Sequence, residues 1–475
     1  MLSWETEGVQ GNWWNSQWDY RVPVTISANG TQRKNKPAEV EIDFDALIAS
    51  LGKAGTLDPN SIRVIEVDQA GNVIDSAVPF QFDVRQDLNE QYNPNVFPGV
   101  DCSTVVSGAG TVTFIMKGTT GANADRYYHI YFDVQGKGLP AASVTPQVIL
   151  TDDVVDPPAP DPGRQASYKV ETSIGTYYYH KKGAGFSSLD DTDGNDWINY
   201  NGEYGSDFGG EFRGIPNLVL PNNGGQFHPG AKDNKLNTCL ISTGPLKTTI
   251  YSIYRKTSSD RWLVTWEIYP TYANMTILVA RYDYWFMYEG TPGGSFEAGT
   301  DFMVRSDGTQ TLLSKEWKTP LAPEQWVFVA DPTVDRSLFA VQHDPDNVQD
   351  WYSVGGNNEM TILGFGRNGS SALIPEAQVP EQFTIGLIDT TVYTDAASLI
   401  RSAYKDLAAT TGEAESYGRR FTWGYNPYRL RVSGTTVGDH GDVCTTDLRI
   451  ESDSPKAREQ QPRTRIRQLT LMGSR

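Results

Sequence analysis

Residues 177–197 hold the densest group of side chains that could take part in chemistry. A strand rich in tyrosine carries His180, runs into a glycine-containing bend and ends in an acidic turn. His180 is one of five histidines in the chain. Because a histidine changes charge near neutral pH, His180 is a candidate for proton transfer or ligand binding, and a packed or surface histidine is the alternative.

The acidic turn offers carboxylate and amide oxygens, the ligands that calcium prefers in sets of six to eight. Its spacing matches only part of a D-x-D-x-D-G loop, because position 189 is leucine. A hairpin turn whose carboxylates bond to their own backbone is therefore the competing interpretation. The candidate calcium ligands are Asp190, Asp191, Asp193, Asn195 and Asp196.

A second histidine, His228, lies in a predicted turn. It follows residues 211–217, which bring Arg213 and Asn217 into loops. A loop histidine near a cation and an amide could serve a site, or it could simply be exposed.

Two glutamates interrupt strands that are otherwise aromatic: Glu267 in WLVTWEIYP and Glu289 in YWFMYEGTPGG. An acid among rings loses hydration, which raises its pKa as a general acid requires. Glycosidases use two such carboxyl groups about 5–10 Å apart. The alternative is that each glutamate faces outward on an alternating strand.

Most of the twelve tryptophans fall in the second half of the chain. Some must fill a core, but an indole that lines a groove could stack on the face of a sugar. The candidates for such a groove are Trp197, Trp266 and Trp285.

The elements that would position these groups are almost all strands. Alternating β-branched and aromatic runs, such as YRVPVTI and YYHIYFDV, predict an N-terminal β-sandwich over residues 1–153. Four prolines within residues 154–167 predict a stiff linker. Residues 168–432 predict a larger antiparallel β-sandwich with one helix at 395–410, and residues 433–475 predict a poorly ordered tail. The fold class is therefore all-β.

The composition excludes several kinds of partner. The 475 residues carry 40 Lys and Arg against 58 Asp and Glu, a net charge of −18, which disfavours nucleic acid and anionic lipid. No apolar run approaches the length of a membrane span, and the start of the chain lacks a signal peptide. Three scattered cysteines predict neither a disulfide framework nor a zinc site. The oligomeric state is left open.

Three phrases resemble the galactose-mutarotase-like supersandwich of polysaccharide lyases and glycosidases, in which a strand pair carries gG-x-x-SL-x-D-x-G-x-D. They are GTYYYHKKGAGFSSLDDTDGNDWI, WEIYPTYANMTIL and YWFMYEGTPGG, and the likeness spans residues 168–411. The opening WWNSQWDYRVPVTI is similar to β-sandwich modules that precede such domains in secreted bacterial proteins.

The resemblance implies an extracellular or periplasmic protein that acts on a polysaccharide or oligosaccharide, first as a lyase that cleaves a uronate glycan by β-elimination. Arg213 and Asn217 would then neutralise the uronate carboxylate, with Lys181 and Lys182 as further counter-charge. His180 or His228 would remove the proton, and Tyr179 or Tyr284 would protonate the leaving oxygen. No cofactor is required, although calcium could assist. The alternatives are a hydrolase using Glu267 and Glu289, and a non-catalytic carbohydrate-binding or surface-assembly protein.

Overall fold

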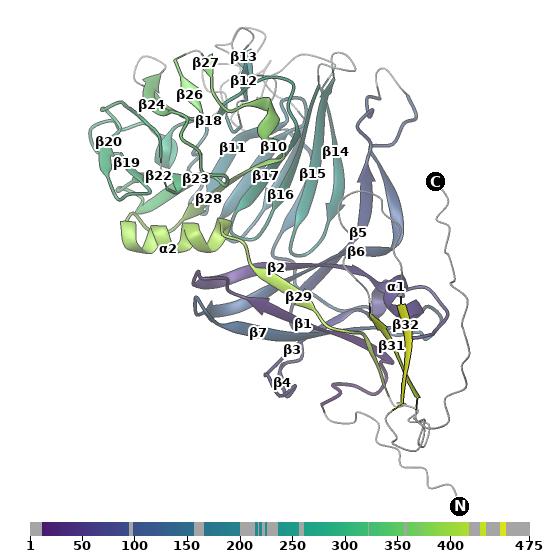
Figure 1. Cartoon of the computed structure of the whole chain (residues 1–475). Helices are drawn as coiled ribbons and strands as arrows, with labels where there is room; N and C mark the ends of the chain where they lie inside the picture. The colour runs from purple at the N-terminus through teal and green to yellow at the C-terminus, as the bar shows by residue number, and fades with distance from the viewer. Residues whose placement is uncertain are drawn as a thin grey trace, which may run out of the picture. The chain divides into compact units, whose positions relative to one another are not determined.

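The computed structural model describes most of the chain up to residue 417 and one strand pair beyond it. It forms a nearly all-β structure of antiparallel sheets (Figure 1), which confirms the predicted fold class. None of the described helices is long and apolar enough to cross a membrane. The described residues are 12–94, 98–155, 166–199, 214–216, 218–220, 224–225, 236–255, 261–321, 323–355, 359–369, 371–417, 428–433 and 447–452.

The first sandwich packs two antiparallel sheets around one apolar core. Val22, Val24 and Ile26 alternate along the first strand and point into this core, as a half-buried strand requires. The elements of this sandwich are β1 (Tyr20–Ser27), β7 (Asp125–Phe132), β3 (Arg63–Val67) and β4 (Val73–Asp75) in one sheet, β2 (Arg33–Asp43), β6 (Ser103–Thr120) and β5 (Phe80–Leu88) in the other, with α1 (Phe44–Ser50) and η1 (Pro59–Ser61).

The chain returns to this sandwich after the second one is complete. β29 (Ala408–Thr411) and β30 (Glu415–Ser416) both pair with β1, so they extend a sheet that begins nearly four hundred residues earlier. The sequence placed residues 408–416 in the larger domain, because a short exposed strand shows no apolar alternation that would assign it to a sheet.

The second sandwich is built on a nine-stranded antiparallel sheet. β28 pairs with β17 on one side and β23 on the other, which places the end of the domain at the centre of its sheet. In spatial order the strands are β14 (Leu236–Thr243), β15 (Thr248–Arg255), β16 (Arg261–Ile268), β17 (Ala273–Val279), β28 (Glu381–Ile388), β23 (Arg336–Gln342), β22 (Gln325–Asp331), β19 (Phe302–Arg305) and β20 (Gln310–Leu312).

Two four-stranded sheets contribute to the core on one face of the nine-stranded sheet. Val155 pairs with Ala166, so the proline-rich residues 156–165, which lie outside the described part, join two neighbouring strands of one sheet. The strands are β11 (Gly185–Asp191), β10 (Gly175–His180), β9 (Ala166–Glu171) and β8 (Ile149–Val155) in one sheet, and β18 (Phe286–Gly290), β25 (Met360–Phe365), β24 (Asp350–Gly355) and β21 (Trp317–Thr319) in the other.

The opposite face of the nine-stranded sheet is covered in part by α2 (Tyr393–Tyr404), whose Ala396 and Ile400 pack on Phe328 and Phe339. This is the predicted helix; it starts two residues earlier and ends at Tyr404, and the chain then extends into β29. The remaining short elements are β12 (Val219–Leu220), β13 (Gly224–Gly225), β26 (Arg367–Asn368), β27 (Ser371–Ala372), η3 (Pro292–Gly294) and η4 (Glu376–Gln378).

Beyond residue 417 the structure describes one antiparallel pair, β31 (Tyr428–Ser433) and β32 (Asp447–Ser452), which belongs to a unit separate from residues 11–417. Within the predicted tail, residues 433–475, this covers Ser433 and β32. The other tail residues lie outside the described part of the chain.

Candidate functional site

A cleft of about 750 Å³ lies between the β2, β6 and β5 sheet of the first sandwich and the outer face of β14, β15 and β16. Four carboxylates and two cations line it, together with the hydroxyl groups of Thr249 and Thr265. The charged residues are Glu41, Asp43, Asp83, Arg85, Lys247 and Glu267.

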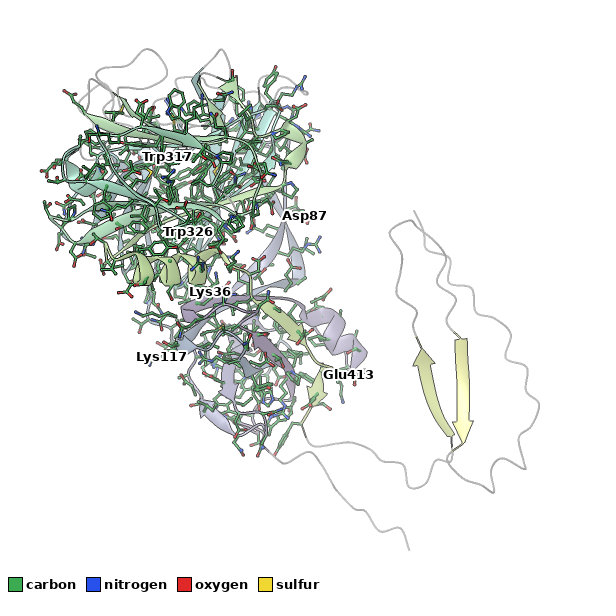
Figure 2. All side chains as sticks on the ribbon, turned by 60° about the vertical axis from the view of Figure 1, so that its left-hand side comes forward. Lys36, Asp87, Lys117, Trp317, Trp326 and Glu413 are labelled. Atoms are coloured by element: carbon green, nitrogen blue, oxygen red, sulfur yellow. The ribbon has the colours of Figure 1, made fainter. Side chains whose placement is uncertain are left out.

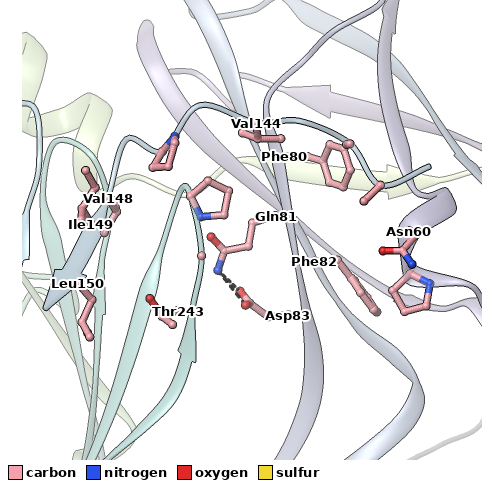
Figure 3. A pocket seen from close by; sticks show the side chains of 16 residues that line it. Asn60, Phe80, Gln81, Phe82, Asp83, Val144, Val148, Ile149, Leu150 and Thr243 are labelled. Carbon is pink, nitrogen blue, oxygen red and sulfur yellow. Dashed lines mark hydrogen bonds between the residues drawn. The ribbon is translucent and has the colours of Figure 1, made fainter. Parts of the chain in front are cut away.

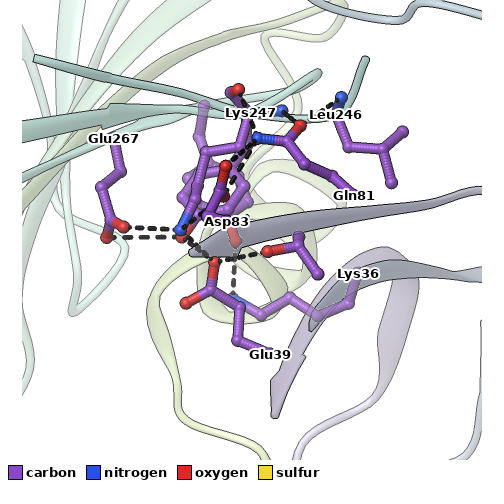
Figure 4. A network of polar contacts seen from close by, with 10 residues as sticks. Lys36, Glu39, Gln81, Asp83, Leu246, Lys247 and Glu267 are labelled. Atoms are coloured by element: carbon purple, nitrogen blue, oxygen red, sulfur yellow. Dashed lines mark hydrogen bonds and ion pairs between the residues drawn. The ribbon is translucent and has the colours of Figure 1, made fainter. Parts of the chain in front are cut away.

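Lys247 is the centre of the charged network in this cleft (Figure 4). Its Nζ lies 2.7 Å from Oε1 of Glu39, 2.7 Å from Oε1 of Glu267 and 3.9 Å from Oδ2 of Asp83. The lysine side chain is only 5% exposed. A buried ammonium needs such partners, because removing an ion from water costs several kcal/mol.

Gln81 fixes the turn that presents Lys247. Its Oε1 accepts hydrogen bonds from the backbone N–H groups of Leu246 (2.9 Å) and Lys247 (2.8 Å). Its Nε2 donates to the carbonyl of Lys247 at 2.9 Å and to Oδ1 of Asp83 at 2.8 Å. A Cβ at Gly244 would overlap this amide, so any larger residue there would have to displace the end of the Gln81 side chain. One side chain of the first sandwich therefore holds both the lysine and an acid of the cleft.

Strand alternation turns Glu267 into the cleft. Trp266 and Ile268 on either side of it are fully buried in the core, so Glu267 points to the opposite face of β16. There its Oε2 also lies 3.4 Å from the hydroxyl of Tyr269, which donates to Oε1 of Glu39 at 2.9 Å. Glu267 therefore points outward from its own sandwich, which is the alternative considered for an alternating strand. Its carboxyl group faces the first sandwich.

The environment separates the acidities of the three carboxyl groups. Burial raises the pKa of Glu267, against the effect of Lys247 and with a further rise from Glu39. Burial also raises the pKa of Asp83, again opposed by Lys247. Against the effect of burial, the charge and hydrogen bond of Lys247 lower the pKa of Glu39. The network around Lys247 thus holds two carboxyl groups that retain protons more readily than usual and one, Glu39, that loses its proton more readily.

A second cation lies near this network, where the two sandwiches meet (Figure 2). Lys36 Nζ donates to the hydroxyl of Tyr272 at 3.0 Å and lies 4.8 Å from the centre of its ring. Burial and the nearby Arg33 lower the pKa of Lys36 to about 7.

A less polar cavity of about 660 Å³ adjoins the cleft (Figure 3). Gln81 and Asp83 line it together with the half-buried rings of Phe80 and Phe82. Because Asp83 lines both cavities, a ligand in one could extend toward the other.

In the predicted calcium turn, both oxygen atoms of the Asp191 carboxylate are engaged by the protein. Oδ1 of Asp191 accepts from the backbone N–H groups of Asp193 (2.9 Å) and Asn195 (3.0 Å), and Oδ2 lies 2.8 Å from Arg336. Against the effect of burial, hydrogen bonds from Asn195 and Trp197 lower the pKa of Asp191 to about 2. These contacts are those of the hairpin turn.

Metal ligation at this turn stays a prediction. Oδ1 of Asp196 accepts from the N–H groups of Leu189 (3.1 Å) and Ile198 (2.9 Å), and burial raises the pKa of Asp196. Among the described residues, no three His, Cys, Asp or Glu side chains are placed to hold a metal ion.

The proton-transfer residues predicted on β10 and near β18 are buried in the second sandwich. The Nδ1 atom of His180 accepts from the N–H of Gly183 at 2.7 Å, and Tyr179 shares a 2.9 Å hydrogen bond with Ser252. Tyr284 is fully buried, and burial strongly raises its pKa. None of these three residues lines the cleft at Lys247.

Two predicted counter-charges sit at the end of β10. The ammonium of Lys181 pairs with Asp152 and, at 2.7 Å, with Asp153, while Lys182 is exposed. Arg213, Asn217 and His228 lie outside the described residues, so their predicted roles stay predictions.

The three tryptophans predicted to stack on sugar are core residues, which corrects that prediction. Trp197 and Trp266 are fully buried and Trp285 is 5% exposed. Trp197 donates to Oδ2 of Asp191 at 3.1 Å, and Trp266 packs edge-on against Phe186. Large rings fill the wide space between sheets, so a high tryptophan content does not mark a groove. Trp317 is likewise in the core between the sheets, and Trp326 is buried on the other face of the nine-stranded sheet, in the cluster that includes Ala396 and Ile400 of α2 (Figure 2).

Glu267 and Glu289 do not form the predicted pair. Phe286 and Tyr288 of β18 point into the core, so Glu289 lies on the far side of its sheet with Met287. The core of the second sandwich therefore separates the two glutamates. The carboxyl groups that meet Glu267 are Glu39 and Asp83, which the sequence did not single out because they belong to strands of another sandwich.

The comparisons with known proteins give little beyond this geometry. No family model and no curated protein matches the chain. Among solved structures, HI1317 is 12% identical with a TM-score of 0.35, covering 52% of this chain and 97% of that chain. The YeaD protein of Salmonella typhimurium is 10% identical with a TM-score of 0.35, covering 50% of this chain and 93% of that chain. These values are too low to assign a family, so the mutarotase-like resemblance stays a prediction.

Proposed function

We propose that this chain is a carbohydrate-active protein that binds a glycan in the cleft at Lys247 and hydrolyses it. The observation that carries the proposal is the convergence of Glu267 and Asp83 on one buried lysine in the wall of a cavity of about 750 Å³. Glycoside hydrolysis uses two carboxyl groups that share one site, one as the acid and the other as the base or nucleophile.

In this proposal Glu267 is the general acid, since burial and the neighbouring Glu39 and Asp83 raise its pKa. It would protonate the oxygen of the leaving sugar. Asp83 is the partner carboxyl group: burial raises its pKa, but Lys247 and the Gln81 amide, which donates to both of its oxygens at 2.8 and 3.0 Å, favour its ionised form. Asp83 would then activate a water molecule or attack the sugar itself.

The charge of the cleft favours a neutral glycan or an amino sugar. Its four carboxylates outnumber Arg85 and Lys247, and Lys247 is already paired. A uronate would bring a further negative charge into this field. The phenylalanine-lined cavity beside Asp83 would accept the apolar face of a neighbouring sugar unit.

A polysaccharide lyase remains the second candidate, on the sequence resemblance. It needs a cation facing the uronate, and the predicted Arg213, Asn217 and His228 would supply that site outside the described residues. Action outside the cytoplasm, where glycan polymers are met, is a further proposal that rests on the same resemblance.

Incubation of the purified chain with a panel of neutral, amino and uronate glycans tests the function. Hydrolysis releases reducing ends without new ultraviolet absorbance, whereas β-elimination gives an unsaturated, absorbing product. We expect reducing ends from a neutral or amino glycan. An unsaturated product from a uronate glycan would contradict hydrolysis and support the lyase function. Binding without turnover would contradict both and indicate a carbohydrate-binding protein.

A further inference from the structure

Two cysteines that are far apart in the sequence meet on the outer face of the nine-stranded sheet. Cys102 directly precedes β6 of the first sandwich, and Cys239 lies in β14 of the second. Both are free thiols and both are half-buried. They belong to one side-chain cluster with Leu88, Tyr92 and Tyr251.

The segment that carries Cys102 is the outer end of the β5–β6 hairpin, residues 85–94 and 98–108, which we term the arm. Figure 1 shows β5 and β6 extending beside β14. Gln86 Nε2 of the arm donates to the carbonyl of Ile241 at 2.6 Å, and Arg261 pairs with Glu90 at 2.6 Å. Polar contacts therefore dock the arm on β14 and β16, and Gln86 and Ile241 also line the cleft.

The two thiols differ in acidity. A hydrogen bond with Cys239 lowers the pKa of Cys102 to about 7, while the same contact and burial strongly raise the pKa of Cys239. Near neutral pH a large fraction of Cys102 is thus thiolate, the nucleophilic form, and Cys239 keeps its proton. An ionised attacking thiol beside a protonated second thiol is the arrangement used in thiol–disulfide exchange.

We propose that Cys102 and Cys239 form a reversible disulfide that fastens the arm to β14 at the edge of the cleft. The proposal goes beyond the proposed function and does not depend on it, because the bond would form whether or not the cleft binds a glycan.

The oxidant is a small disulfide such as oxidised glutathione. The Cys102 thiolate attacks one of its sulfur atoms, forms a mixed disulfide and releases one glutathione thiolate. Cys239 then gives its proton to the released glutathione thiolate and attacks the Cys102 sulfur, which forms the protein disulfide and releases the second glutathione as a thiolate. Two protein thiols are oxidised and one glutathione disulfide is reduced to two thiols.

Peptide mapping of the folded wild-type chain tests this without a mutation. The chain is equilibrated in buffers of graded reduced to oxidised glutathione, alkylated and digested without reduction. We expect a peptide pair joined through Cys102 and Cys239 that increases with the oxidised fraction and disappears after reduction. Cys102 should also be alkylated faster than Cys239, with a rate that rises through about pH 7.

Variants and hydrogen exchange supply the controls. Cys102→Ser and Cys239→Ser should each abolish the linked pair, whereas Cys444→Ser, the third cysteine of the chain, should retain it. Oxidation should increase the protection of arm amides in wild type and in Cys444→Ser. Unlinked Cys102 and Cys239 in the most oxidising buffer, a stable glutathione adduct on Cys102, or a link to Cys444 would each overturn the proposal.

Discussion

Glu39 and Lys247 belong to different sandwiches, and Oε1 of Glu39 lies 2.7 Å from Nζ of Lys247. Gln81 of the first sandwich also accepts hydrogen bonds from the Leu246–Lys247 turn of the second. The cleft is therefore formed by residues of both sandwiches. The catalytic proposal therefore depends on the contact between them, since neither sandwich alone holds the lysine and its three carboxylates.

The buried lysine should be essential to stability. In Lys247→Met, Glu39, Asp83 and Glu267 would lose their shared cation, and breaking a buried ion pair costs about 3–5 kcal/mol. We expect a clear fall in the free energy of unfolding, measured by denaturant titration. Lys182→Met, at an exposed lysine, is the matched control and should leave it nearly unchanged. Equal stabilities of the two variants would show that the network is dispensable.

Gly244 tests the clamp formed by Gln81. A methyl group at this position would overlap the Gln81 amide, so Gly244→Ala should displace that amide from the turn and lower the melting temperature. Gly299→Ala is the control, because a Cβ there has open space and the backbone is not in the left-handed region, so only the lost flexibility of glycine acts at that site. If Gly244→Ala is as stable as wild type and keeps its turnover, Gln81 does not position Lys247 as described.

A buried carboxyl outside the cleft should make the stability depend on pH. Burial, with Asp344 and Asp346, raises the pKa of Glu381 from 4.5 to about 8. A group whose pKa is raised in the folded state stabilises fully below its unfolded pKa, and that contribution is lost as the pH rises through the folded value. Glu381→Gln stays neutral, so its melting temperature relative to wild type should increase between about pH 5 and about pH 9.

The control for this pH experiment is Glu359→Gln, at an exposed glutamate. Its difference from wild type should change with pH far less than that of Glu381→Gln. An equally small change for Glu381→Gln would mean that Glu381 titrates normally.

The acidic turn should be held by the protein's own contacts. Asp191→Asn would weaken the ion pair with Arg336 and the bonds to the turn, at a cost of about 1–3 kcal/mol. Calcium bound to the folded state would stabilise it by mass action, so removing bound calcium would lower the melting temperature. Since the turn is held by protein contacts, we expect a chelator to leave the melting temperature of wild type unchanged. A fall on chelation that added calcium reverses would instead establish the calcium site.

Local patterns predicted the strands well, because alternation reports which face of a strand is buried. The run YYHIYFDV lies largely within β7, and RWLVTWEI is β16 with its tryptophans inward. The same rule could not assign β29, where four exposed residues pair with a strand from the other end of the chain. Pairing over that separation leaves no local signal.

The candidate site was harder to predict from the sequence, because its residues are also far apart along the chain. Glu267 was recognised as an acid on an aromatic strand, but its partners Lys247, Glu39 and Asp83 carry no shared spacing. Cys102 and Cys239 were likewise described as scattered, and only the docking of the arm on β14 brings them together. Rings in the sequence indicated sugar stacking, whereas Trp197 and Trp266 fill the core.

Turnover by Glu267→Gln, compared with Glu66→Gln, tests the central claim most directly. Glu66 is also a paired carboxylate of low exposure, 2.5 Å from Arg126, but it belongs to β3 and does not line the cleft. On a glycan that wild type hydrolyses, we predict that Glu267→Gln loses at least about 10²-fold in kcat, as expected for a general acid, and that Glu66→Gln retains wild-type kcat. A folded Glu267→Gln protein with undiminished kcat would contradict the assignment of the active site to this cleft.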